Sequence, residues 1–124
     1  MENSFFGNPK KFKLDIKGRV NIPAEFRRIL NGDSIYTNYI NRDLIRCYPT
    51  GIYERRREEM LEKEDDDKEK QIFFLAEKCE IDNKGRIQLR GPISKLEEVI
   101  VAPNGDVFDI WSPREFPYKY YITE

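Results

Sequence analysis

A nine-residue pattern occurs twice in this chain and constrains its fold more than any other feature. Residues 12–20 and 79–87 both contain Asp-x-Lys-Gly-Arg, and apolar residues alternate with polar ones on either side. Such alternation predicts β-strands, and the glycine in each copy can take the positive φ angle that a tight turn requires. We therefore expect an internal duplication, in which each copy forms two strands joined by a turn that carries two cations.

The rest of the chain predicts a similar order of elements in each half. Hairpins or strands are expected over residues 12–22, 34–38, 44–48, 78–89, 99–102 and 107–111. Helices are expected over residues 24–30, over residues 52–69 and from Ser112 onward. Pro92 follows the second pattern two positions later than Pro23 follows the first, which predicts a shorter helix there. We divide the chain into a first repeat (1–53), a charged helical connector (54–70) and a second repeat (71–124).

The formal net charge of −1 conceals a strong local asymmetry. Residues 1–30 contain seven Lys/Arg and three Asp/Glu, whereas residues 54–70 contain six Lys/Arg and nine Asp/Glu. Exposed charges act over only about 8 Å at physiological salt, so the local charge decides which partner a surface attracts. The net charge therefore does not exclude a nucleic acid as partner.

Catalytic chemistry has few candidates in this composition. The chain contains no histidine, which excludes Ser-His-Asp and Cys-His catalysis and most zinc sites. Asp15 and Asp82 could share a proton as aspartic peptidase carboxylates do, but neither stands in the Asp-Thr/Ser-Gly order of those enzymes. Cys47 and Cys79 are expected to be free thiols rather than a disulfide or redox pair. We expect no enzyme, metal or cofactor and, without a signal peptide or apolar span, a cytoplasmic protein.

The repeated turn can be read in two ways. A solvated turn needs its glycine, but it has no need for a lysine before the glycine and an arginine after it in both copies. A nucleic-acid contact does need them, because the arginine fork can bind guanine or phosphate and the lysine supplies a compact charge. The candidate DNA-binding residues are Arg19, Lys17, Arg86, Lys84, Lys13, Lys11 and Lys10. The residues expected to shape the turns are Asp15, Gly18, Asp82 and Gly85.

Segments along almost the whole chain resemble the MraZ family. They are Phe6-Gly7, residues 14–23 with Phe26-Arg27, Tyr48-Pro49, residues 73–76, residues 81–87 and Asp109-Ile110-Trp111. The resemblance implies tandem SpoVT-AbrB domains. We therefore expect an α+β fold in which two repeats interleave their hairpins into a swapped-hairpin barrel with pseudo-two-fold symmetry, accompanied by short helices.

The same resemblance implies a bacterial, nucleoid-associated transcriptional regulator, acting by repression or tuning on the division and cell-wall gene cluster. Family members form rings, commonly octamers, that bind G-rich promoter repeats, so the expected partners are double-stranded DNA and further copies of this chain. Carried over by position, the DNA-contacting loop falls on residues 15–19, with Arg86 as the counterpart of Arg19. Two alternatives stay open: an AbrB-type antitoxin-like module whose acidic residues 58–69 bind a basic toxin, and a ring scaffold that has lost DNA binding.

Overall fold

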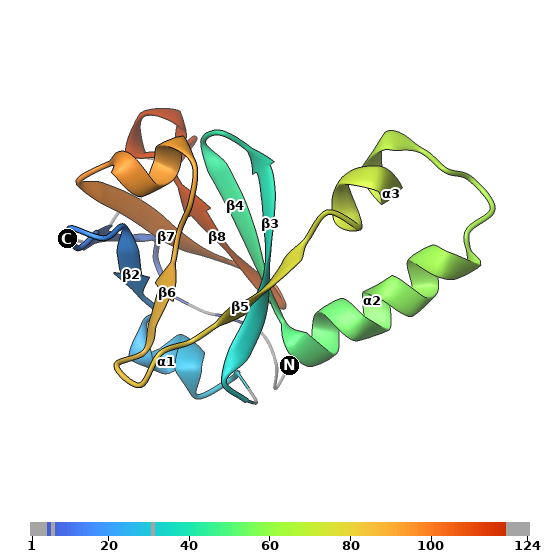
Figure 1. Ribbon diagram of the computed structural model, residues 1–124, viewed down its shortest axis with the longest axis horizontal. Helices are drawn as coiled ribbons and strands as arrows, with labels where there is room; N and C mark the ends of the chain where they lie inside the picture. The colour runs from blue at the N-terminus through green and yellow to red at the C-terminus, as the bar shows by residue number, and fades with distance from the viewer. Residues whose placement is uncertain (1–4, 6, 31, 119–124) are drawn as a thin grey trace.

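The structure, a computed structural model, has the α+β architecture expected from the sequence (Figure 1). It describes residues 5, 7–30 and 32–118, so Phe6, which contributes to the family resemblance, lies outside the described residues. The strands are β1 (Lys10–Lys13), β2 (Arg19–Asn21), β3 (Ser34–Asn41), β4 (Leu44–Pro49), β5 (Glu77–Glu80), β6 (Arg86–Gln88), β7 (Glu98–Asn104) and β8 (Val107–Trp111). The α-helices are α1 (Ala24–Arg27), α2 (Thr50–Glu62) and α3 (Lys68–Phe73), and the 3₁₀ helices are η1 (Pro92–Lys95) and η2 (Pro113–Glu115).

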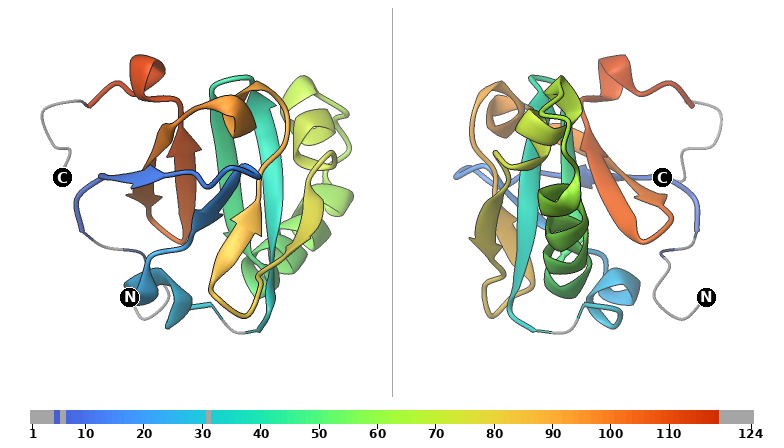
Figure 2. Two further views of the ribbon diagram at one scale, coloured as in Figure 1. Left: turned by 60° about the vertical axis from the view of Figure 1, so that its left-hand side comes forward. Right: turned by 90° about the vertical axis from the view of Figure 1, so that its right-hand side faces the viewer.

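The strands form one sheet and one separate ribbon. Six antiparallel strands follow the order β1-β7-β8-β4-β3-β5, while β2 and β6 lie beside each other, apart from the sheet (Figure 2, left). The simple hairpins expected over residues 12–22 and 78–89 are therefore wrong. The turns form, but β1 pairs with β7, β5 pairs with β3, and β2 pairs with β6. Alternation of apolar residues predicts a strand without specifying its partner, and the partners found here bury both copies against one core.

The strand order is symmetric between the two halves of the chain. If β1, β3 and β4 are exchanged with β5, β7 and β8, the order of the six-stranded sheet reads the same in reverse. The centre of this topological symmetry lies between β8 and β4 in the sheet and between β2 and β6 in the ribbon. Corresponding strands of the two halves thus occupy corresponding positions.

The main core lies between the ribbon and the sheet. Val20 of β2 and Ile87 of β6 are each 1% exposed and belong to the same buried cluster as Phe108 of β8. The rings of Phe5 and Phe26 pack against Phe108 with centroid distances of 5.2 and 5.3 Å. This packing joins the ribbon, the sheet and α1, and it fixes where the outer face of the ribbon points.

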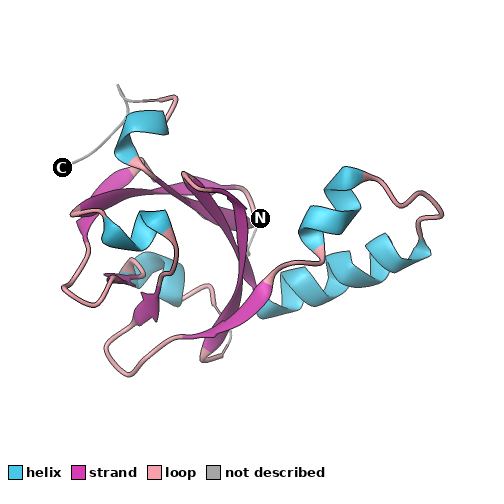
Figure 3. Cartoon of the chain, turned by 45° about the horizontal axis from the view of Figure 1, so that its top comes forward, coloured by secondary structure: helices cyan, strands magenta, loops and turns pink. Residues whose placement is uncertain are grey.

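Helices α2 and α3 form an arm that projects away from the strands (Figures 1 and 3). An aromatic cluster lies at the base of this arm, where the Tyr53 ring stacks on Phe73 and Tyr36 with centroid distances of 4.6 and 4.2 Å. The Tyr53 hydroxyl also donates to the Phe73 carbonyl oxygen at 3.1 Å. Stacked rings therefore help to hold the arm to β3, together with a hydrogen bond from Asn38 Nδ2 to the Ile72 carbonyl oxygen at 2.9 Å.

The connector consists of two helices, not the single helix expected over residues 52–69. Residues 64–67, which lie between α2 and α3, are four consecutive acids, and the three aspartates among them disfavour a continuous helix because aspartate has a low helix propensity. Asp67 accepts a hydrogen bond from the Lys70 backbone amide at 2.8 Å and so caps the beginning of α3. The acidic run thus ends one helix and starts the next.

The remaining helices are short. The helix expected over residues 24–30 ends at Arg27, and only residues 28 and 29 continue it as a turn. The shorter helix expected after the second pattern is confirmed, since Pro92 begins the single-turn helix η1. None of the helices in the described part of the chain is long and apolar enough to cross a membrane.

The two cysteines are free thiols, as expected. Cys47 is buried in β4 and Cys79 is half-buried in β5. Burial raises the pKa of both thiols, so both stay protonated at neutral pH. Neither thiol therefore has the ionised character of a reactive cysteine.

Candidate nucleic-acid interface

The β2–β6 ribbon presents polar side chains on its outer face. Its register pairs Arg19 with Gln88, Val20 with Ile87, and Asn21 with Arg86. Val20 and Ile87 are buried, and successive side chains of a strand point to opposite faces. Arg19 and Arg86 therefore share the outer face, although they stand 67 positions apart in the sequence.

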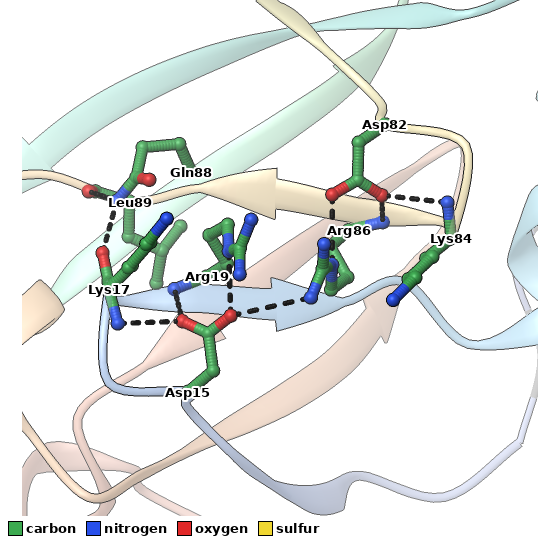
Figure 4. A network of polar contacts seen from close by, with 8 residues as sticks. All are labelled: Asp15, Lys17, Arg19, Asp82, Lys84, Arg86, Gln88 and Leu89. Carbon is green, nitrogen blue, oxygen red and sulfur yellow. Dashed lines mark hydrogen bonds and ion pairs between the residues drawn. The ribbon is translucent and has the colours of Figure 1, made fainter.

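The first Asp-x-Lys-Gly-Arg segment forms a turn around its aspartate (Figure 4). Asp15 Oδ1 accepts hydrogen bonds from the backbone amides of Lys17 and Arg19 at 3.0 and 2.8 Å. Asp15 Oδ2 accepts from Arg19 Nε at 2.6 Å, and the Gly18 amide donates to the Asp15 carbonyl oxygen at 3.0 Å. One aspartate thus holds both the turn and the arginine.

The second turn repeats these contacts. Asp82 Oδ1 accepts from the backbone amides of Lys84 and Arg86 at 2.9 Å each, and Asp82 Oδ2 accepts from Arg86 Nε at 2.8 Å. In addition, Arg86 Nη1 lies 3.5 Å from Asp15 Oδ2, so the first aspartate contacts both arginines (Figure 4). The two turns form one connected network of charges.

Each turn is also anchored by the other half of the chain. The Leu89 amide donates to the Gly18 carbonyl oxygen at 3.1 Å, and the Ile22 amide donates to the Gly85 carbonyl oxygen at 2.8 Å. The two donors directly follow β2 and β6 in the chain, and the two acceptor glycines directly precede these strands. The bonds therefore hold each turn beside the ribbon. Both turns are therefore rigid parts of the fold rather than free loops.

The electrostatics of the network keep the arginines oriented but accessible. The hydrogen bond from the Arg19 backbone amide, together with the Arg19 side chain, lowers the pKa of Asp15, and Arg86 lowers the pKa of Asp82 in the same way. Both carboxylates are ionised at neutral pH. The side chains of Arg19 and Arg86 remain 28% and 21% exposed, and no acceptor in the described part of the chain contacts the Nη groups of Arg19. The guanidinium groups are thus held in place without being closed off from a ligand.

The predicted lysines fall into two groups. Lys17 and Lys84 are exposed and lie at opposite ends of the arginine pair (Figure 4). The other three predicted lysines lie on β1: Lys10, Lys11 and Lys13. This strand pairs with β7 and not with the ribbon, and Lys10 Nζ contacts Glu25 Oε1 at 3.1 Å. The structure therefore groups the turn lysines with the arginines and gives Lys10 a different partner.

Two further cations lie beside the turns, and the repeated pattern does not include them. The Arg27 guanidinium lies against Gly85, because a Cβ atom added to this glycine would stand 2.6 Å from Arg27 Nη1. Lys95 lines a surface groove together with Lys17 and Ile16 of the first turn. Arg27 and Lys95 are the last residues of α1 and η1, so a basic residue at the end of each proline-led helix is the sequence signal that points to them.

The site offers no constellation for metal binding or aspartic acid catalysis. Among the described residues, no group of three or more Cys, Asp and Glu side chains could hold a metal ion. Asp15 and Asp82 each pair with an arginine, which stabilises both as carboxylates and opposes the sharing of a proton. The network thus presents cations held in place by carboxylates.

We expect Gly18→Ala to destabilise the fold more than Gly85→Ala. Both glycines have positive φ angles, 78° and 80°, where a Cβ atom costs roughly 1–2 kcal/mol. At Gly18 the added Cβ would also stand 2.9 Å from the Ser94 backbone oxygen, whereas at Gly85 it would meet only the flexible end of Arg27. Urea denaturation should therefore show an additional loss of about 1 kcal/mol for Gly18→Ala. Equal losses in the two variants would contradict this difference.

Comparison with known proteins points to one family. The family model described as "MraZ protein, putative antitoxin-like" matches residues 5–74, which is more than half of the chain. A protein of Leuconostoc citreum named "Transcriptional regulator MraZ" is 35% identical over 120 residues, covering 90% of this chain and 82% of the relative. A protein of Leuconostoc mesenteroides with the same name is 34% identical over 108 residues, covering 80% of this chain and 75% of the relative. Another with this name, from Syntrophobacter fumaroxidans, is 28% identical over 123 residues, covering 90% of this chain and 82% of the relative. The resemblance seen in the sequence is confirmed, and the chain belongs to the MraZ family.

Proposed function

We propose that this protein is a transcriptional regulator that binds duplex DNA sequence-specifically through the outer face of the β2–β6 ribbon and its two turns. The observation that carries the proposal is the pair of partly exposed arginines, Arg19 and Arg86, each fixed by an aspartate through Nε on one face of the ribbon. The name shared by the relatives, "Transcriptional regulator MraZ", supports the same function.

The shape of the ribbon suits the major groove of DNA. The groove is about 12 Å wide and admits a two-stranded β-ribbon. Because Nε of Arg19 is bound to Asp15, its two Nη groups are the donors left for guanine O6 and N7. Lys17 and Lys84, one at each end of the arginine pair, suit contacts with phosphates. In this proposal the arginines read bases and the lysines position the ribbon.

The finer proposal concerns the target and the assembly. We propose that several copies, eight as is common in the family, form a ring at the nucleoid and repress a division and cell-wall gene promoter by binding its G-rich repeats. Each copy would offer one ribbon to one repeat, so individually weak contacts would add through avidity.

We also propose that the chain is a duplication of one SpoVT-AbrB-like unit. The repeats are residues 1–53 and 71–124, joined by residues 54–70. Two observations support this division: the strand order is symmetric between the halves, and both turns contain the same aspartate contacts. The pairing of β1 with β7, of β5 with β3 and of β2 with β6 also supports a swapped-hairpin barrel.

Selection of bound sequences from a pool of random DNA duplexes tests the proposed function. We expect enrichment of a G-rich repeat and an affinity that falls steeply with salt, because each neutralised phosphate releases counterions. Measuring the affinity for the selected duplex and for a scrambled duplex between 50 and 200 mM salt gives both the specificity and the phosphate contribution. Failure to enrich any sequence would reject the proposal.

The same preparation distinguishes the two alternatives. A ring scaffold without DNA binding would give a large particle by light scattering and no salt-dependent affinity for DNA. An antitoxin-like module would copurify from its native host with a basic polypeptide bound to the acidic residues 58–69. The proposed regulator should instead purify as copies of a single chain.

A further inference from the structure

Ile16 is the most exposed large apolar side chain in the described part of the chain. It is 102% exposed and stands between two charged residues, Asp15 and Lys17, in the first turn. A single exposed apolar residue needs no explanation by itself. This one, however, lies inside the candidate interface, on a turn that Asp15 holds by hydrogen bonds.

The turn itself does not require an isoleucine. The Gly18 amide closes a four-residue turn with the Asp15 carbonyl oxygen at 3.0 Å, which places Ile16 at the second position with its side chain outward. The matching position of the second turn is Asn83, which is also exposed and is a residue type common in turns. Isoleucine is a strand-forming residue and gains nothing here from burial within the fold. Two turns of the same geometry thus differ mainly in what they present at the tip.

We infer that Ile16 is a specificity-determining residue that contacts the C5-methyl group of a thymine in the major groove, near the base read by Arg19. This inference rests on the proposed DNA-binding function. Apolar side chains recognise thymine through this methyl group, which no other base of unmodified DNA carries. Asp15 bonds to Arg19 and begins the turn that carries Ile16, so the backbone that bears Ile16 is tied to the arginine that reads the neighbouring base. The second turn, with Asn83, lacks this apolar contact, and the two turns therefore differ in base preference.

Removal of single methyl groups from the DNA tests the inference. The probe is a duplex enriched from the random pool, with each thymine replaced in turn by deoxyuridine, and the affinity is measured by fluorescence anisotropy. At one or a few positions, deoxyuridine should weaken binding of the unaltered protein by about fourfold, the equivalent of exposing one methyl group. Ile16→Ala and Ile16→Asn should bind the thymine duplex with the same loss and should no longer distinguish thymine from deoxyuridine.

Matched variants separate this contact from other effects. Asn83→Ala should keep the full sensitivity to deoxyuridine, and all Ile16 variants should keep the melting temperature and the oligomer mass of the unaltered protein. Three results would each overturn the inference. The first is that Ile16→Ala still distinguishes thymine from deoxyuridine, and the second is that the unaltered protein distinguishes them at no position. The third is a changed oligomer mass in Ile16→Asn. These outcomes would leave specific DNA binding intact, whereas an absence of any enriched duplex is a failure of the proposed function itself.

Discussion

Replacing Arg19 and Arg86 together with alanine is expected to remove sequence-specific DNA binding. A bidentate contact between arginine and guanine discriminates by about 1–3 kcal/mol, so the loss of two such contacts in each subunit corresponds to roughly 30-fold to 20,000-fold. The two arginines are the groups that the turns hold most firmly, with Nε to carboxylate distances of 2.6 and 2.8 Å. The measurement is the ratio of affinities for the selected and the scrambled duplex.

The stability of this double variant should change much less than its binding. Both ion pairs are partly exposed, and pairs of this kind contribute about 0–1 kcal/mol each. The matched control replaces both arginines with lysine, which retains the charge but lacks the planar fork. We expect the lysine variant to keep salt-dependent binding to any duplex and to lose its preference for the selected one. A loss of folding stability that accounts for the whole loss of binding would contradict a contact role for these arginines.

Phe108→Ala is expected to reduce the free energy of unfolding by about 3–5 kcal/mol, the range found for large aromatic side chains in well-packed cores. Phe108 is 1% exposed, and its ring contacts Phe5 and Phe26, so its removal leaves a cavity where the sheet, α1 and the N-terminal segment meet. Urea denaturation followed by circular dichroism measures the change. DNA binding should decline in parallel, because this core positions the ribbon.

A matched control for this core substitution is Leu75→Ala. Leu75 is 72% exposed, and its truncation should change the free energy of unfolding by less than about 0.5 kcal/mol in a single isolated copy. A cost for Phe108→Ala below about 1.5 kcal/mol would show that the space around Phe5 and Phe26 collapses after truncation. The ribbon would then depend less on this core than the packing indicates.

The local parts of the candidate interface could be predicted from the sequence. The aspartate, glycine and arginine of each pattern determine the turn through contacts within five residues of one another, so the pattern contains nearly all the information about its own geometry. The alternation around Val20 and Ile87 likewise predicts which strand faces are buried. The break in the connector could also have been predicted from the sequence, because aspartate is a residue type that favours the N-cap position, and Asp67 directly precedes α3.

The assembly of these parts required the tertiary structure. No local signal indicates that β2 pairs with β6, that Arg86 Nη1 approaches Asp15, or that Arg27 lies against Gly85. A period of two in the sequence specifies the inner and outer faces of a strand, but the choice of its neighbour depends on burial summed over distant segments. The sequence by itself thus determined two rigid cationic turns and a membership in the MraZ family. Only the tertiary structure decided that both turns flank a single ribbon, because the pairing of β2 with β6 brings Val20 and Ile87 from distant segments into one core.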